Sequence, residues 1–303
     1  MVHRCAVVAI VGRPNVGKST LINQLVGQKL SITSRKAQTT RHRITGIFNR
    51  ADLQIVFVDT PGVQRRHAAA LNRQLNKTAL SALSDVDLAL WVIEATGMTA
   101  EDEQVLAMMP VDLPLIAVLN KSDRIRSDHD RVRAYALGDR LAAMNRFKAL
   151  VPVSAEKGTQ VEAVIAEIEK LAPEAPAMFE EDQVSDRSVR FLAAEIIREK
   201  LFRLLGDELP YEVTVMIDRF DEAPSIKNPS RPHAEISASI VVAKASQKPL
   251  VIGEKGERIK RIGSDARKDI AELIQGSVHL ELWVKVKSGW ADDEAAVRAF
   301  GYE

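Results

Sequence analysis

The sequence predicts an α/β domain built on a mainly parallel sheet, followed by a smaller α+β domain. Three observations predict this architecture. The β-branched run Val7–Val11 breaks into a glycine-containing loop, and the helix-forming stretch Leu21–Leu25 follows. Apolar strand patterns then alternate with helical patterns from residue 5 to about residue 172, which is typical of a parallel sheet covered on both faces. After Pro173 the order becomes helix, strand, strand, helix, helix, strand, so we expect a second fold there.

Length and composition are those of an ordinary globular protein. The 303 residues are 46% hydrophobic and 27% charged, and the chain is long enough for two cores. The net charge of +1 indicates that any basic surface must be local. Cys5 is the only cysteine, which excludes an internal disulfide and predicts a buried structural thiol. No apolar run approaches the length of a membrane span, so we expect no signal peptide, no transmembrane helix and a cytoplasmic protein.

The first domain is expected over residues 1–173. Apolar runs predict strands at Cys5–Val11, Ile44–Phe48, Leu53–Val58, Leu88–Ile93, Leu115–Leu119 and Leu150–Val153. Helical spacing predicts helices that include Leu71–Leu83, Glu101–Met109, Arg131–Met144 and Val161–Leu171. Two prolines in 173–176 and the acidic, apolar-poor stretch 180–183 then predict a linker over 174–187.

A Gly-x-x-x-x-Gly-Lys-Ser pattern follows the first strand, in the strand–loop–helix context that a phosphate-binding loop requires. Its glycines let backbone N–H groups and a helix N-terminus point at one anion. We expect Lys18 to reach the β- and γ-phosphates and the Ser19 hydroxyl to ligate Mg²⁺. A plain glycine-rich turn is the alternative, and the context disfavours it. The nucleotide-binding candidates here are Gly12, Arg13, Pro14, Asn15, Val16, Gly17, Lys18, Ser19 and Thr20.

A second motif, Asp59-Thr60-Pro61-Gly62, lies at the end of the third predicted strand. Asp59 can hold Mg²⁺ through a water, and the Gly62 N–H can meet a γ-phosphate. The pattern is common by chance, so its value comes from its place at a strand end downstream of the phosphate loop. Ligands of such sheets bind at the carboxyl ends of the strands.

A third motif, Asn120-Lys121-Ser122-Asp123, follows the strand Leu115–Leu119. The Asp123 carboxylate can accept hydrogen bonds from N1–H and the exocyclic N2 of guanine. Adenine lacks this donor pair and would leave the carboxylate unpaired, so the motif favours guanine. A charged turn after a strand is the alternative. Ser154-Ala155 fits a loop that offers a backbone N–H to the guanine O6, and this weaker signal depends on the other motifs.

Together these motifs resemble the translation-factor class of GTPases, and the segment Gln38-Thr39-Thr40-Arg41-His42-Arg43 resembles the first switch of the Era family. The resemblance implies that Thr40 coordinates Mg²⁺ when GTP is bound, with Thr39 as the less favoured choice. A solvated Thr/Arg-rich loop is the alternative. The catalytic candidates are Lys18, Thr40, Asp59, Gly62 and Asn15.

Val63 stands directly after Gly62, where many GTPases place the glutamine that orients the attacking water. Gln64 is one residue out of register, so we do not assign it that role. Without this positioning group intrinsic hydrolysis is expected to be slow. Related GTPases with asparagine at the position of Asn15 bind K⁺ near the phosphates, which makes K⁺ a candidate cofactor beside Mg²⁺. A small polar residue that merely fits a tight loop is an equal alternative.

The second domain is expected over residues 188–303. An apolar stripe from Val189 to Leu205 predicts an amphipathic helix. Alternation predicts strands at Val213–Ile217 and Ile236–Val242, separated by a loop that contains Pro224, Pro229 and Pro232. A helix is expected to run to about Gln275 and a last strand over Val278–Val286.

Gly253-x-x-Gly256 lies between the two central helices of this domain, and the element order then resembles a type II KH domain. In KH domains this loop clamps the backbone of about four nucleotides beside an apolar groove for unstacked bases. Residues 253–268 carry six basic and three acidic side chains, a local charge of +3. A helix–helix turn is the alternative. The RNA-binding candidates are Ile252, Gly253, Glu254, Lys255, Gly256, Arg258, Ile259 and Lys260.

The combination of both domains with this switch resembles the Era family over essentially the whole chain. The resemblance implies a Mg²⁺-dependent GTP-hydrolysing switch that binds near the 3′ end of small-subunit ribosomal RNA and assists maturation of that subunit. It also implies GTP and GDP as ligands, a monomer, and peripheral association with the cytoplasmic face of the inner membrane, for which the sequence shows no anchor. Two alternatives are a P-loop kinase of a small molecule and an RNA-binding module whose nucleotide site is structural.

Overall fold

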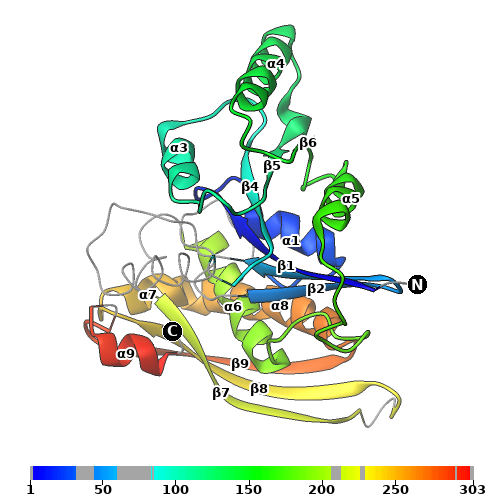
Figure 1. Cartoon of the computed structure of the whole chain (residues 1–303). Coiled ribbons are helices and arrows are strands. Elements are labelled where there is room, and N and C mark those ends of the chain that lie inside the picture. Colours follow the sequence, from blue (N-terminus) through cyan, green and yellow to red (C-terminus); the bar gives the residue numbers. More distant parts are fainter. Residues whose placement is uncertain are drawn as a thin grey trace. The chain divides into compact units, whose positions relative to one another are not determined.

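The computed structural model describes residues 3–31, 44–59, 83, 85–205, 213–225, 229–290 and 292–300 (Figure 1). These residues form two compact units, which meet in the sequence between Asp186 and Arg187. Each unit is described by itself.

The first unit contains a six-stranded sheet in the order β2-β3-β1-β4-β5-β6. Strands β3, β1, β4, β5 and β6 are parallel, whereas β2 pairs antiparallel with β3. The mainly parallel sheet expected from the sequence is therefore confirmed. The strands are β1 Arg4–Val11, β2 Ile44–Arg50, β3 Leu53–Asp59, β4 Leu88–Glu94, β5 Leu115–Asn120 and β6 Ala149–Pro152.

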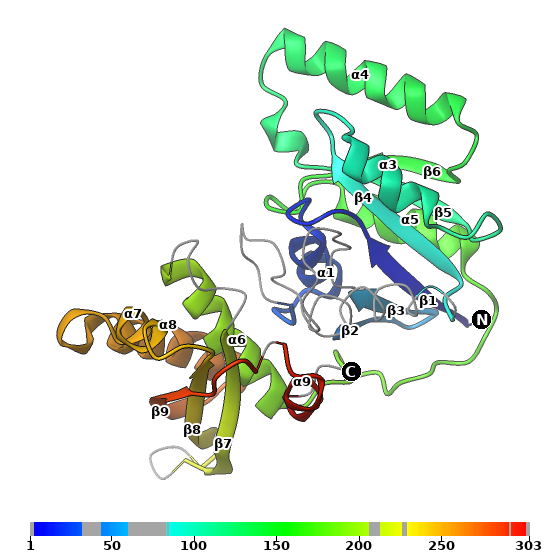
Figure 2. The ribbon, with the colours of Figure 1, turned by 90° about the vertical axis from the view of Figure 1, so that its left-hand side faces the viewer.

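Helices cover both faces of this sheet. Side chains of α1 (Lys18–Val26) and α5 (Val161–Leu171) pack into one apolar cluster with Val8, Ile10 and Phe57. Side chains of α3 (Ala100–Ala107) and α4 (Asp128–Ala143) pack into a second cluster on the opposite face. Figure 2 shows α4 next to β6, which it contacts. The predicted helix Leu71–Leu83 lies outside the described residues except for Leu83.

One helix begins earlier than periodicity predicts. Helix α4 starts at Asp128 rather than Arg131, because Ser127 and Asp130 form a capping box around its first turn. The Asp130 N–H donates to the Ser127 hydroxyl at 3.1 Å, and the Ser127 N–H donates back to the Asp130 carboxylate at 3.1 Å. This pair satisfies N–H groups that a helix start leaves unpaired.

The segment 174–186 runs along the first unit and hydrogen-bonds to it. The Asn49 amide donates to the Glu181 carbonyl at 2.9 Å, and the Gln54 amide donates to the Phe179 carbonyl at 3.0 Å. Near its end, the Thr45 hydroxyl donates to Asp186 at 3.0 Å. Cys5 is buried beside Gln54, as expected for a structural thiol, and burial raises the pKa of that thiol.

The second unit has a three-stranded sheet in the order β7-β8-β9, with α6 and α8 packed on it (Figure 1). Strand β8 is antiparallel to β7 and parallel to β9. The core joins apolar residues of these strands with Ile196, Ile197, Ile262 and Ile270 of the helices. The elements are α6 Val189–Leu204, β7 Val213–Pro224, β8 Pro232–Val242, α7 Gln247–Ile252, the 3₁₀ turn η4 Glu254–Gly256, α8 Glu257–Leu273, β9 Ser277–Val286 and α9 Glu294–Ala299.

The expectation that Pro224 and Pro232 belong to a loop is wrong. The β7–β8 ladder continues to these two prolines, which face each other as its last pair. Proline cannot donate to a ladder, so it is tolerated at strand ends but not inside a central strand. The ladder also shifts register between Ile217 and Arg219, which interrupts the alternation that a sequence pattern would follow. The short helix α9 was not expected.

Candidate nucleotide site and RNA groove

The phosphate loop joins β1 to α1 at the carboxyl edge of the sheet. A Cβ at Gly12 would lie 2.4 Å from the Val92 carbonyl oxygen, and one at Gly17 would lie 2.3 Å from the Asn120 side chain. Gly17 also has φ 100° and caps α1, a conformation that favours glycine. Both glycines are therefore required by close packing of the loop against β4 and β5.

Lys18 is the first residue of α1 and is only 6% exposed. Its ammonium donates to the carbonyls of Gly12 at 2.9 Å and Arg13 at 3.0 Å, so the side chain lies back over the loop. Burial lowers the pKa of Lys18 to about 8, with the nearby Asp59 carboxylate opposing the shift. An anion bound in this loop would restore the charged form.

Asp59, the last residue of β3, is fully buried beside the start of α1. Its Oδ2 accepts from the Ser19 hydroxyl at 3.2 Å and from the Ser31 hydroxyl at 2.6 Å. The structure thus brings together the two predicted Mg²⁺-binding residues that it describes, Ser19 and Asp59. Ser31 was not predicted, because no short motif marks it. The described residues contain no group of three or more His, Cys, Asp or Glu side chains that could hold a metal unaided.

The third motif is built around Asn120, which is 2% exposed. Its amide donates to the Val16 carbonyl of the phosphate loop at 2.7 Å. Its oxygen accepts from the N–H groups of Lys121 at 2.7 Å and Ala155 at 3.0 Å. Asn120 therefore ties three predicted loops together. In the Ser154-Ala155 loop, which we expected to offer a backbone N–H to guanine, the Ala155 N–H donates to Asn120.

Asp123 lies in the 3₁₀ turn η1 (Ser122–Arg124), which follows β5. Its Oδ1 accepts from the Ser154 hydroxyl at 2.5 Å, and the Ser122 N–H donates to the Val153 carbonyl at 3.0 Å. Ser154 is 1% exposed. The loop after β6 therefore orients the carboxylate that we expect to recognise the base.

Two acidic residues that sequence reasoning missed fix the cations of this region. Glu94, at the carboxyl end of β4, accepts from the Lys121 ammonium at 2.6 Å and lies 3.4 Å from the Arg13 guanidinium. Asp102 is fully buried and pairs with the Arg13 Nε at 3.1 Å. The Lys121 ammonium also donates to the Asn15 carbonyl at 2.6 Å. Only the position of Glu94 at a strand end could have indicated it.

The charge of Glu94 is maintained by these partners. Partial burial disfavours the charged form, but the hydrogen bond and charge of Lys121, with help from Arg13, outweigh it and hold the pKa of Glu94 below its usual range.

Asn15 itself is exposed and has φ 66°. The other predicted residues, Thr40, Thr60, Pro61 and Gly62, lie outside the described residues, as do Val63 and Gln64.

In the second unit the predicted Gly-x-x-Gly loop joins α7 to α8. Gly253 ends α7 with φ 76°, Lys255 has φ 48°, and Gly256 begins α8 with φ 79°. A Cβ at Gly253 would lie 2.6 Å from the Arg258 Cβ, whereas one at Gly256 would meet open space. Arg258 donates to the Leu250 carbonyl and so braces the loop against α7.

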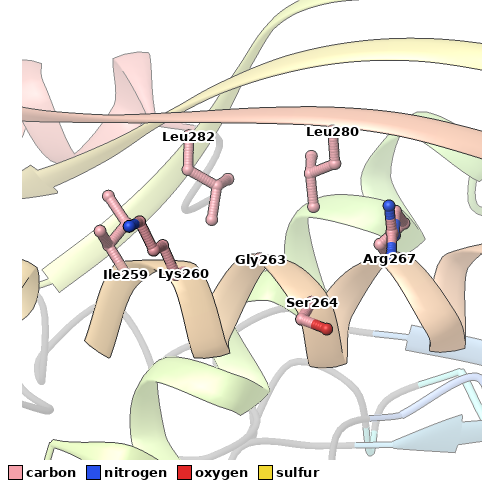
Figure 3. A pocket seen from close by; sticks show the side chains of 7 residues that line it. All are labelled: Ile259, Lys260, Gly263, Ser264, Arg267, Leu280 and Leu282. Carbon is pink, nitrogen blue, oxygen red and sulfur yellow. The ribbon is translucent and has the colours of Figure 1, made fainter. Parts of the chain in front are cut away.

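A groove of about 340 Å³ lies between α8 and β9 (Figure 3). Leu280 and Leu282 point from β9 toward α8, and the side chains of Lys260 and Arg267 flank the space. Its lining residues are Ile259, Lys260, Gly263, Ser264, Arg267, Leu280 and Leu282. Of these, only Ile259 and Lys260 were predicted as RNA-binding residues. Gly263, Ser264 and Arg267 lie further along α8 than the motif reaches, and the two leucines belong to β9, which approaches α8 only in the folded chain.

Known families and solved structures match both units of this chain. A family model described as 50S ribosome-binding GTPase matches residues 7–121, and a KH domain model matches residues 208–291. A point variant of Era from Aquifex aeolicus bound to GDP.AlF4- is 38% identical, with a TM-score of 0.91 and 99% of each chain covered. A structure of Era with MgGDPNP and nucleotides 1506–1542 of 16S ribosomal RNA matches equally well. The chain thus belongs to the Era family, GTPases with a C-terminal KH domain.

Proposed function

We propose that this GTPase is a switch that binds small-subunit ribosomal RNA near its 3′ end and assists maturation of the small ribosomal subunit. The observation that carries the proposal is the 38% identity, over 99% of the chain, to an Era protein in complex with MgGDPNP and 16S ribosomal RNA. The kinase and the purely RNA-binding alternatives are set aside by the family assignment. A cytoplasmic location follows from such a partner.

The first unit supplies the nucleotide site in this proposal. Lys18 and the N–H groups at the start of α1 bind the phosphates, because both concentrate positive charge at the loop. Asp123, oriented by Ser154, accepts from guanine. Asn120 holds the phosphate loop and the base-binding loops in one arrangement. Thr60 and Pro61 are assigned to GTP binding, and the Gly62 N–H to the γ-phosphate, from the sequence alone.

Mg²⁺ is the metal that fits the residues present. Ser19 and Asp59 offer only oxygen atoms, and Mg²⁺ binds protein sites through few oxygen ligands together with nucleotide phosphates. We assign direct ligation to Ser19 and, in the GTP state, Thr40, and we assign contact through a water to Asp59. When bound, Mg²⁺ would neutralise negative charge on the nucleotide phosphates while the γ-phosphoryl group is transferred to water.

K⁺ is proposed as a second cation, held by Asn15 near the phosphates. The Asn15 side chain is exposed, and its carbonyl is fixed by Lys121, which supports a defined position for the residue. A cation there would offset the negative charge that develops on the β–γ bridging oxygen. This stabilisation would compensate for the missing glutamine that orients the attacking water in many GTPases.

The second unit supplies the RNA site. The Gly253–Gly256 loop allows close approach of a phosphate backbone, and the groove beside it has apolar walls with flanking cations, as unstacked bases require. To the predicted residues the groove adds Gly263, Ser264, Arg267, Leu280 and Leu282.

Gly256→Asp tests the RNA site against Gly256→Asn as its matched control. Both side chains have the same shape and tolerate a positive φ, and a Cβ at this position meets open space, so the pair differs in charge alone. We expect the carboxylate to repel RNA phosphate and weaken filter binding of a 16S 3′-end fragment more than the amide does. GTP hydrolysis without RNA should be equal in the two variants. Equal RNA binding would contradict the proposal.

Peripheral membrane association and a monomeric state stay predictions of the resemblance. Among the described residues, none of the helices combines the length and the apolar character needed to cross a membrane.

A further inference from the structure

Ser31 is a buried hydroxyl that no sequence motif accounts for. It is 1% exposed, and its hydroxyl donates to Asp59 Oδ2 at 2.6 Å. The same Oδ2 accepts from the Ser19 hydroxyl at 3.2 Å. A single carboxylate oxygen therefore receives two hydroxyl donors, one from the proposed metal ligand and one from Ser31.

The position of Ser31 is fixed by helix α1. The Asn23 side-chain oxygen accepts from the N–H groups of Leu30 at 2.9 Å and Ser31 at 2.8 Å, and its amide donates to the Ser31 carbonyl at 2.7 Å. The same helix carries Lys18 and Ser19 in its first turn. The Ser31 hydroxyl and the proposed metal ligand are thus held by one rigid element.

We propose that Ser31 is a positioning residue for the Mg²⁺ site, an inference that rests on the proposed role of Asp59. Two donors on Oδ2, both anchored to α1, stop the Asp59 carboxylate from rotating about its last side-chain bond. The carboxylate then keeps the orientation in which it orders a Mg²⁺-bound water. A hydrogen bond to a charged group is stronger than one between neutral groups, so the bond from Ser31 can hold the Asp59 carboxylate in this orientation.

The test is the Mg²⁺ dependence of GDP binding by the full chain, followed with a fluorescent GDP analogue. For Ser31→Ala we expect a rise of about tenfold in the Mg²⁺ concentration that gives half of the Mg²⁺-dependent increase in GDP affinity. This factor corresponds to the free energy of about one charge-assisted hydrogen bond. GDP affinity in EDTA should stay unchanged, because the phosphate contacts of α1 are intact. Ser31→Thr, which keeps the hydroxyl, should restore the normal Mg²⁺ requirement.

Thr45→Val is the matched control, since it removes a buried hydroxyl that donates to a carboxylate outside the site, Asp186. It should leave the Mg²⁺ requirement unchanged. Asp59→Asn should raise it, and Ser31→Ala should then add little, because the two residues act through one contact.

Three outcomes would overturn the inference. A normal Mg²⁺ requirement in Ser31→Ala, with Asp59→Asn shifted, removes the role of Ser31 and leaves the proposed metal site intact. An equal loss of GDP affinity with and without Mg²⁺ assigns Ser31 a general structural role. An unshifted Asp59→Asn refutes the metal site itself, and the role of Ser31 fails with it.

Discussion

Asp59 and Asp123, the two carboxylates proposed to serve the nucleotide, are each held by a serine from a distant segment. Ser31 donates to Asp59, and Ser154 donates to Asp123. In both cases the serine is buried, so the bond is shielded from competing water. The sequence identifies the carboxylates because they stand in spaced motifs. It identifies Ser154 only through its neighbours, and it cannot identify Ser31, whose role depends on a contact between β3 and the segment that follows α1.

Asp123→Asn should exchange the preference for guanine for a preference for xanthine. The asparagine amide can donate to the acceptor at C2 of xanthine, whereas it lacks the second acceptor for the N1–H and N2 of guanine. Its side-chain oxygen can still accept from Ser154, so the loop should keep its shape. Competition between GTP and xanthosine triphosphate in a binding assay measures the exchange. A variant that still prefers GTP would show that another residue reads the base.

Lys18 should take up a proton when nucleotide binds at alkaline pH. Its pKa of about 8 in the free protein leaves much of the side chain neutral above pH 8, and phosphate binding favours the charged form. The uptake should be larger at pH 8.5 than at pH 7.5, because more of the Lys18 side chain is neutral at the higher pH. Calorimetry of GDP binding in buffers of different ionisation enthalpy measures it. Equal uptake at the two pH values would exclude Lys18 as its source.

Hydrolysis should be faster in K⁺ than in Na⁺ at matched ionic strength, since the smaller Na⁺ fits a K⁺-sized shell poorly. Asn15→Ala should abolish the difference while nucleotide affinity changes little. Asn145→Ala is the matched control, because Asn145 is also exposed and has φ 50°, so both changes carry a similar backbone cost. Equal rates in the two salts, with RNA present, would refute the K⁺ site.

At the scale of elements, periodicity locates most helices and strands but not their ends. Most strands of the first unit are near-continuous apolar runs, and each one lies within two residues of its predicted bounds. The strands β7 and β8 extend well past theirs, because the two prolines suggest a loop although they pair with each other across the ladder. Helix α9 has six residues, too few for a periodic signal.

The groove between α8 and β9 leads to a prediction in which one substitution raises thermal stability and lowers RNA affinity. A Cβ at Gly263 would lie 3.5 Å from Leu282, an ordinary contact, so Gly263→Ala should fold normally and place a methyl group in the groove. Alanine in a helix interior is favoured over glycine by about 0.5–1 kcal/mol. Thermal stability should therefore rise while affinity for the 16S fragment falls.

Gly138→Ala in helix α4 is the control for this change. A Cβ there meets nothing within 4 Å, so the substitution should raise stability without touching the RNA site. Thermal melts and filter binding of both variants separate the two effects. If Gly263→Ala binds RNA as tightly as Gly138→Ala does, bases do not occupy the groove.

At the scale of the whole molecule, the chain joins a well-formed nucleotide site to a weakly basic RNA surface. The sequence predicts both units because their motifs lie within single elements and the loops that follow them. It cannot place the contacts made between elements, such as Arg13 with Asp102 or Asn120 with Val16. These contacts depend on how strands and helices pack, which no local spacing encodes.

The charge distribution of the chain predicts how its affinity for RNA depends on salt concentration. The chain carries +1 in total and +3 over 253–268, so long-range attraction to RNA is weak and most binding energy must come from the groove. A loop that clamps about four nucleotides of single-stranded RNA should displace the counterions of their phosphates. The logarithm of the RNA association constant should then fall with the logarithm of the salt concentration with a slope of about −3. Filter binding of the 16S fragment across a range of KCl concentrations measures this slope.

Neutralising one cation of the groove should make that slope shallower by roughly 0.7 for each RNA phosphate that the cation had neutralised. Arg267→Gln is suited to the test, because Arg267 flanks the groove and is exposed. Arg140→Gln, an exposed arginine of α4 that pairs with Glu103, is the control and should leave the slope unchanged. A slope twice as steep as expected would mean that the RNA backbone meets many cations outside residues 253–268. The KH groove would then select the bases, while another surface of the protein supplied most of the electrostatic attraction.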